Sequence, residues 1–238
     1  MLDHPIFTAS ITLIRTELAA IAANDAALCA QLAALAPLER EVLERCIHSS
    51  GDLAIAADLR FAPVQLACSR GLAALQAGAP ILCDTAMAAA AVGPMARRTL
   101  GNRVRCLLDW APADAPPGST RSAAAVEAAW AELTSRLGTA MGQAATADPA
   151  PVVLIGSAPT ALERLLDLVE AGAPAPALLI GMPVGFVGVA ESKRRLAASG
   201  LAQLRLEGSK GGAALVAAAC NALLRHGALQ AASAPPSP

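Results

Sequence analysis

The chain has no tyrosine, and histidine is scarce as well: His4, His48 and His226 are the only three among 238 residues. So few imidazoles argue against a histidine-rich metal site. The sequence also contains no H-E-x-x-H motif and no cysteine–histidine spacing suited to zinc. We therefore expect no resident metal ion.

Motifs of several common enzyme classes are missing too. No predicted strand is followed by G-x-G-x-x-G, as a dinucleotide site would require. The stretch "GSKGG" (208–212) does not match the phosphate loop G-x-x-x-x-G-K-[ST], and "GSAPT" (156–160) does not match the nucleophile elbow G-x-S-x-G. These absences count against nucleotide and serine-hydrolase chemistry.

Six cysteines are scattered without a C-x-x-C pair, and the N-terminus lacks the basic-then-apolar pattern of a secretory signal. We expect reduced thiols packed as small hydrophobic residues in a cytoplasmic protein. Residues 171–190 are uncharged, but three prolines and four glycines interrupt them, which predicts loop–strand–loop rather than a membrane span. The net charge of −1 provides no general attraction for nucleic acid or an anionic membrane.

Apolar spacing predicts a helical N-terminal portion and then alternating strands and helices. Strand-like runs cover residues 80–84, 103–109, 151–156, 177–181 and 203–208. Helical spacing covers residues 11–23, 37–50, 63–78, 160–172, 190–200 and 213–227. This alternation predicts one α/β domain over residues 1–227, with a mainly parallel sheet of about five strands covered on both faces. We expect residues 228–238 to be a disordered tail.

Three loops with little side-chain bulk follow predicted strands, at residues 156–161, 181–192 and 208–213. Ligands of parallel sheets bind at the carboxyl ends of the strands, where helix N-termini favour anions. The loops therefore indicate an anionic ligand. Ordinary tight turns between strands and helices explain each single loop equally well.

Several stretches together resemble one known family, in that family's order. They are "RCIHSSGD" (45–52), "AGAPILCDTAM" (77–87), "STRSAAA" (119–125), "GSAPTAL" (156–162) and "GMPVGFVGVAESK" (181–193). The family is that of the precorrin-8X methylmutases, or precorrin isomerases, and the resemblance spans roughly residues 6–225. The last stretch is highly specific, whereas "GSAPTAL" alone is weak.

The resemblance implies a three-layer α/β/α fold, a homodimer and an isomerase of cobalamin biosynthesis. Such an enzyme moves a methyl group from carbon 11 to carbon 12 of precorrin-8X to give hydrogenobyrinate, or performs the equivalent step on cobalt-precorrin-8. It needs no redox cofactor. The ligand would be a broad, flat tetrapyrrole fringed with carboxylates, which suits loops rich in glycine and exposed N–H groups.

The family's catalytic histidine corresponds to His48, which would lend a proton to a ring nitrogen during methyl migration. At 100° per residue, His48 falls on the polar half of its helix with Glu41, Glu44 and Arg45. Arg45, one turn earlier, would hold a substrate carboxylate. Periodicity alone favours simpler alternatives: a solvated His48 paired with Glu44, and a surface pair between Arg45 and Glu41.

Four further residues are expected to bind substrate on the strength of the resemblance. Ser10 corresponds to a serine that contacts substrate, although a helix N-cap is the simpler interpretation. Arg121 corresponds to an arginine near the macrocycle, and otherwise it is a surface residue in a first helical turn. Gly185 and Gly188 lie in the specific loop, whose backbone would approach the macrocycle.

The chain departs from the family's pattern at several places. Ala86 stands where members often carry Glu or Asn, Gly93 lies in a turn where many have a hydroxyl residue, and the aromatic N-terminal lead-in is missing. Two other functions remain open at this level. One is a tetrapyrrole carrier without turnover, and the other is an unrelated α/β enzyme that binds a phosphate ester.

Overall fold

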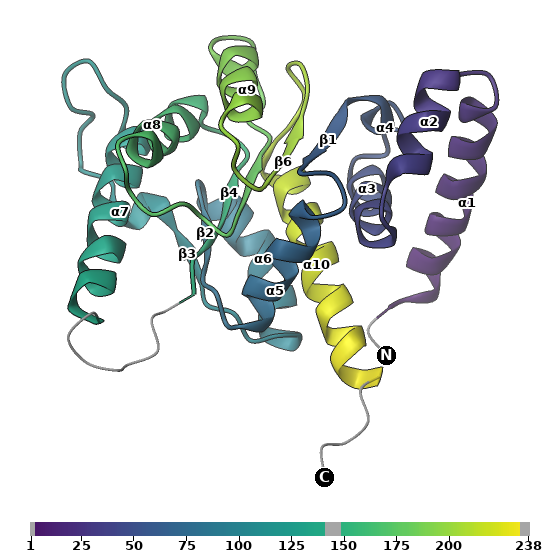
Figure 1. Cartoon of the computed structure of the whole chain (residues 1–238), viewed down its shortest axis with the longest axis horizontal. Helices are drawn as coiled ribbons and strands as arrows, with labels where there is room; N and C mark the ends of the chain where they lie inside the picture. The colour runs from purple at the N-terminus through teal and green to yellow at the C-terminus, as the bar shows by residue number, and fades with distance from the viewer. Residues whose placement is uncertain (1–2, 141–148, 234–238) are drawn as a thin grey trace.

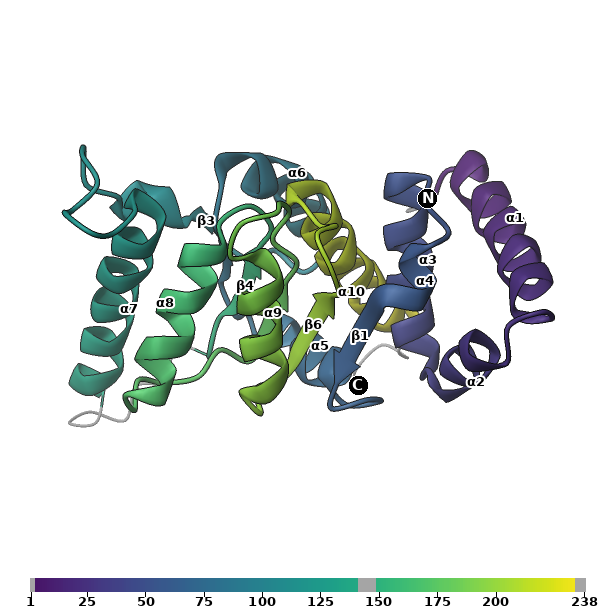
Figure 2. The ribbon, with the colours of Figure 1, turned by 90° about the horizontal axis from the view of Figure 1, so that it is seen from above.

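A computed structural model describes residues 3–140 and 149–233 of the chain, folded as three layers with a sheet between two sets of helices (Figures 1 and 2). The helices are α1 (Pro5–Ala22), α2 (Ala26–Ala34), α3 (Pro37–Ser50), α4 (Ile55–Asp58), α5 (Ala67–Gln76), α6 (Ala86–Arg98), α7 (Arg121–Ala140), α8 (Pro159–Glu170), α9 (Val189–Ala198) and α10 (Ala213–Ser233), with a short 3₁₀ turn η1 (Leu107–Trp110). The strands are β1 (Leu59–Ala62), β2 (Ile81–Cys83), β3 (Val104–Cys106), β4 (Val152–Ile155), β5 (Leu178–Gly181) and β6 (Gln203–Leu206).

The sheet has six strands in the order β1-β6-β5-β4-β2-β3. Strands β2 to β6 are parallel and confirm the predicted mainly parallel sheet, while β1 pairs with β6 in the antiparallel direction. The prediction of about five strands missed β1, because its four residues lie between helices and only alternate ones are buried. An edge strand this short has little pattern to detect.

Successive residues of the central strands pack alternately on the two faces of the sheet. In β4, Val152 and Leu154 pack toward α5, α6 and α10, whereas Val153 and Ile155 pack toward α7, α8 and α9. Both faces are therefore covered, and the strands read as continuous apolar runs. The helices α1 to α3 extend the first layer beyond α10 (Figure 2).

The structure corrects two predictions, the end of the last helix and the position of Gly93. Helix α10 continues to Ser233, so residues 228–233 are helical instead of belonging to a disordered tail; residues 234–238 lie outside the described part. Gly93 does not lie in a turn but inside α6, directly before Pro94. The added length of α10 is explained by alanine and leucine, which favour helix.

Helix α1 is long and apolar enough to cross a membrane by length and composition alone, a test that core helices and signal sequences also pass. Its Arg15 forms an ion pair with buried Glu44 of α3, with 2.7 Å between Nε and Oε1. All six cysteines are free, and only Cys29 is exposed. The other five pack as the small hydrophobic residues that the sequence predicts.

Candidate active site

His48 lies in the last turn of α3, which ends where Gly51 adopts a left-handed conformation at φ 68°. Helix α3 begins at Pro37 without a side-chain cap, and the Glu39 carboxylate accepts the Ala36 N–H instead. The buried side chains of α3 face α10 and the core. His48 itself is half-buried, and it lines a groove with Ala214 at the start of α10, which follows the carboxyl end of β6.

Ser10, in the second turn of α1, is the direct partner of His48. Its Oγ lies 2.8 Å from His48 Nδ1. Ser10 is not a helix N-cap, because His4 occupies that position and accepts the Ile6 N–H. Nε2 of His48 has no hydrogen-bond partner in residues 3–140 and 149–233. The contact therefore orients the ring and leaves Nε2 as the atom open to a ligand.

Phe7 of α1 is an aromatic residue of this site that the sequence argument missed. Its ring meets His48 edge-on, with 5.1 Å between ring centroids and an interplanar angle of 88°. The Arg45 guanidinium lies 4.7 Å from the centre of the same ring. The helical spacing of Phe7 and Ser10 was the available signal, since residues three apart share a helix face.

A groove of about 270 Å³ opens beside His48, between α3, α6 and α10. It is lined by Arg45, His48, Ser49, Ala91, Ala214, Ala217, Ala218 and Asn221. Most of the α10 and α6 lining is alanine, so the walls are formed close to the backbone. Such a surface suits a broad ligand; its polar groups are Arg45, His48 and Ser49 on the α3 side and Asn221 on α10.

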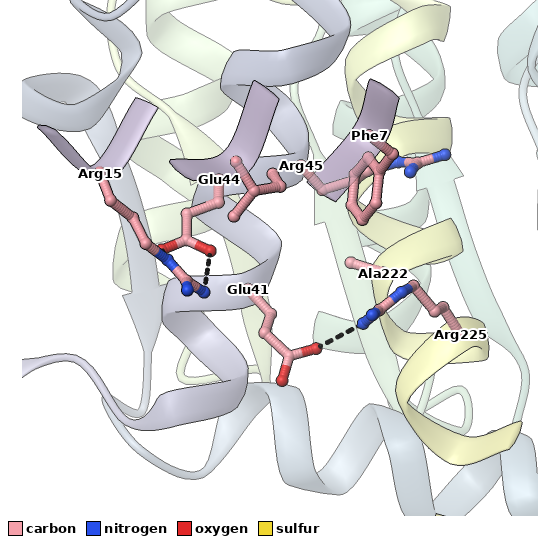
Figure 3. Close-up of a pocket in the computed structure, with 8 residues that line it drawn as sticks. Phe7, Arg15, Glu41, Glu44, Arg45, Ala222 and Arg225 are labelled. Carbon is pink, nitrogen blue, oxygen red and sulfur yellow. Dashed lines mark hydrogen bonds and ion pairs between the residues drawn. The ribbon is translucent and has the colours of Figure 1, made fainter. Parts of the chain in front are cut away.

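The pocket that adjoins Arg45 contains a charge network from three helices (Figure 3). Glu41 accepts from Arg225 at 3.2 Å and lies 3.1 Å from His226, and Arg225 also donates to Asp3 at 2.7 Å. Arg45 has no ion-pair partner among the described residues and lies against the Phe7 ring (Figure 3).

Both simple pairings expected from periodicity are therefore absent. Glu44 is only 2% exposed and pairs with Arg15, not with His48. Glu41 pairs with α10, not with Arg45. Helical periodicity placed these carboxylates on a polar face, but α1 and α10 cover that face with arginines.

The surroundings of His48 disfavour its charged form. Burial lowers the pKa of His48, and the Arg45 guanidinium lowers it further. Burial likewise lowers the pKa of Arg45, with Arg225 as the next cause. A carboxylate bound at Arg45 would pair with the guanidinium charge. It would thereby also reduce the lowering effect of Arg45 on the pKa of His48.

The loop at residues 156–161 is not free to bind an anion as the sequence suggested. The buried Asp84, at the end of β2, accepts the backbone N–H groups of Gly156, Ser157 and Ala158 at 3.0, 2.6 and 3.1 Å. These amides already have an internal carboxylate partner. The tight-turn alternative is correct for this loop.

The loop between β5 and α9 carries Gly185 and Gly188. Gly188 is the N-cap of α9 with φ 71°, a conformation that favours glycine whatever the ligand. The Gly185 N–H donates to Ser209 O at 3.0 Å. Between the two glycines, Phe186 and Val187 are 93% and 89% exposed. This loop presents an apolar tip at the same edge of the sheet as His48.

Arg121 lies in the first turn of α7, at the opposite end of the molecule from α1 and α3 (Figures 1 and 2). Its Nε donates to Pro112 O at 2.9 Å, and the side chain is exposed. A single chain thus brings Ser10, Arg45 and His48 together and leaves Arg121 apart. In the described residues no group of three or more His, Cys, Asp or Glu side chains could hold a metal ion.

Comparison with known proteins identifies close relatives over nearly the whole chain. The sequence model of the family described as precorrin-8X methylmutase matches residues 5–226. A precorrin-8X methylmutase of Pseudomonas aeruginosa is 43% identical over 225 residues, covering 92% of this chain and 93% of the relative. A cobalt-precorrin-8 methylmutase of Synechocystis is 34% identical, with 80% and 86% covered. The crystal structure of a precorrin-8X methylmutase from Thermus thermophilus matches with a TM-score of 0.69 at 39% identity, covering 82% of this chain and 89% of that one.

Proposed function

Because the chain belongs to the precorrin-8X methylmutase family, it is an isomerase of cobalamin biosynthesis, and we propose that His48 assists its methyl transfer. The reaction moves a methyl group from carbon 11 to carbon 12 of the macrocycle. The observation that carries the proposal is the 2.8 Å contact between Ser10 Oγ and His48 Nδ1. It leaves Nε2 to exchange a proton with a ring nitrogen of the substrate.

The serine hydroxyl suits a proton that is lent and recovered. After Nε2 has lent its proton, the neutral imidazole keeps Nδ1–H, which donates to the Ser10 oxygen. When both ring nitrogens are protonated, the Nδ1–H donates to the Ser10 oxygen. The uncharged hydroxyl accepts from Nδ1–H in both states, whereas a carboxylate in its place would hold the ring as the imidazolium. The rearrangement has no net proton change, so such a reversible group fits it.

Arg45 is proposed to bind one of the substrate's carboxylates. It is half-buried, stacked on Phe7 and without an ion-pair partner among the described residues. A charge-assisted hydrogen bond at this guanidinium contributes roughly 1.5–3 kcal/mol. The same contact would raise the pKa of His48 by neutralising the neighbouring cation. Substrate binding and protonation of His48 are thereby coupled.

The cobalt-free substrate, precorrin-8X, is the proposed form. The relatives from Pseudomonas aeruginosa and a Sinorhizobium species, 43% and 40% identical, are named precorrin-8X methylmutases. Relatives named cobalt-precorrin-8 methylmutases are 34% identical or less. All of these are names of enzymes, which favours catalysis over the carrier function. Turnover of the two substrates compared side by side tests the assignment.

We also propose a cytoplasmic homodimer whose second copy completes the site. Pockets that bury a drug-sized ligand measure about 300–1,000 Å³, whereas the groove beside His48 measures about 270 Å³. A second copy could supply Arg121 to the macrocycle held by His48 and by the loop that carries Gly185 and Gly188. Light scattering at micromolar protein measures the mass, and an active monomer would contradict the dimer.

The role of His48 is tested by single-turnover visible spectroscopy with excess enzyme and precorrin-8X. His48→Ala should bind the macrocycle and take on its colour, but convert it about 10²–10⁴-fold more slowly. His226→Ala is the matched control, since His226 contacts Glu41 at the far end of α10. Conversion by His48→Ala within a few-fold of wild type would remove His48 from the mechanism.

A further inference from the structure

Lys193 of α9 is a buried cation that forms no ion pair within the described residues, although the carboxylates of Glu207 and Asp58 act on it at longer range. It is 1% exposed and is among the largest of the fully buried side chains. Its Nζ donates to Gly208 O at 2.8 Å and to Lys210 O at 2.6 Å. Burial lowers its pKa to about 8. Burying a charge whose direct partners are carbonyl oxygens is costly for the fold, even with the Glu207 and Asp58 carboxylates nearby, so its presence calls for a reason other than stability.

Both carbonyl acceptors belong to the loop at residues 207–212, which connects β6 to α10. This loop is packed tightly against the β5–α9 loop. The Gly212 N–H donates to Met182 O at 2.9 Å, and a Cβ on Gly211 would lie 2.0 Å from Met182 O. With the bond from Gly185 N–H to Ser209 O, the two loops form one rigid rim.

The same loop also contacts the segment that directly follows the His48 helix. Lys210 Nζ lies 2.6 Å from Asp52 Oδ2, and Asp52 Oδ1 accepts the Ala54 N–H at 2.9 Å. Asp52 is four residues beyond His48, just past the end of α3. On its other side the loop leads into α10, whose Ala214 lines the groove. A continuous series of contacts therefore joins Lys193 to both walls of the candidate site.

We infer that Lys193 is a positioning residue: its ammonium clamps the β6–α10 loop, and through that loop it fixes the β5–α9 rim and the end of α3 around the macrocycle. The inference rests on the proposed function for its ligand. Lys193 itself does not contact the substrate in this inference. Its effect is to keep the Gly185 backbone and His48 in one geometry before substrate arrives.

Lys193→Met tests this role, because methionine keeps an unbranched apolar stem and removes the ammonium. Arg194→Met is the matched control on the same helix, since Arg194 is exposed and, within the described residues, pairs only with Glu191 at 2.9 Å. We expect kcat/KM for precorrin-8X to fall ~10-fold or more, mainly through KM, with the pH profile of kcat unchanged. Hydrogen exchange at the Gly185 and Gly212 amides should accelerate by about tenfold. The control should match wild type in both measurements.

Unchanged exchange and unchanged KM in Lys193→Met would overturn the inference. If that variant fails to fold, Lys210→Met decides the matter, because Lys210 is exposed and its loss breaks only the link to Asp52. A raised KM there supports the series of contacts, and a wild-type KM refutes it. If wild-type protein itself converts no precorrin-8X, the proposed function fails, while the two amide exchange rates still test the clamp.

Discussion

Ser10 Oγ and His48 Nδ1, from helices α1 and α3, lie 2.8 Å apart although 38 residues separate them in the chain. Within the described residues, this is the one hydrogen bond that His48 Nδ1 makes. The pair therefore determines which nitrogen of His48 is offered to the groove and which protonation states the ring can adopt without rearrangement.

Ser10→Ala should lower kcat and leave binding of the reaction product almost unchanged. Loss of one neutral hydrogen bond of about 0.5–1.5 kcal/mol corresponds to a rate decrease of roughly threefold to tenfold. Nitrogen-15 NMR of His48 should show a changed balance between its two neutral tautomers. Thr12→Ala is the control, because the Thr12 hydroxyl bonds only to Thr8 O in its own helix at 3.1 Å. A variant that loses product binding instead would make Ser10 a substrate contact.

Arg45→Gln should raise the pKa of His48 in the empty protein. Removing the cation favours the imidazolium. Burial is the larger cause of the lowered pKa and persists in the variant, so the pKa of His48 should rise only part of the way to its ordinary value. Since the folded state holds this proton more weakly than the unfolded chain, His48 costs stability as pH falls below the ordinary histidine value of ~6.5. Below that pH, the Arg45→Gln variant should lose less free energy of unfolding than the wild-type protein. NMR titration of His48 measures the shift, and Arg40→Gln, at the other end of α3, should leave it unmoved.

Arg121→Ala should weaken product binding about tenfold or more, as expected for loss of a charge-assisted bond. Its helix lies far from α3 in one chain (Figure 2), so the proposed dimer makes a sharper prediction. Mixed dimers of Arg121→Ala and His48→Ala should regain activity at low substrate, because one of their two sites is then intact. Activity no greater than the sum of the separate variants would argue against a shared site.

Asp84→Ala should lower the free energy of unfolding by about 2–4 kcal/mol, because three backbone N–H groups of the 156–158 turn lose their acceptor. Urea denaturation followed by circular dichroism measures the change. Asp114→Ala, in the exposed loop before α7, serves as the control and should be neutral. If Asp84→Ala changed the free energy of unfolding as little as the control does, the 156–158 turn would not depend on the Asp84 carboxylate.

Much of the architecture was predictable because it depends on local pattern. Strands β2 to β6 are short apolar runs, and α3, α8 and α9 show helical spacing, so their alternation alone indicated a parallel sheet covered on both faces. The family motifs identified His48 as the residue to examine. Strand β1 was missed because four residues with alternating burial carry too little pattern.

Partners distant in the chain were decided only by the tertiary structure. Periodicity placed Glu44 and Glu41 on the polar face of α3 beside His48 and Arg45, but packing of α1 and α10 gave them Arg15 and Arg225 instead. Asp84 likewise accepts hydrogen bonds from backbone N–H groups more than seventy residues further along the chain. A hydrogen bond requires donor and acceptor within about 3 Å, and that proximity depends on how whole helices pack. The sequence therefore determined which residues carry the chemistry, and the fold determined which of them remain free to use it.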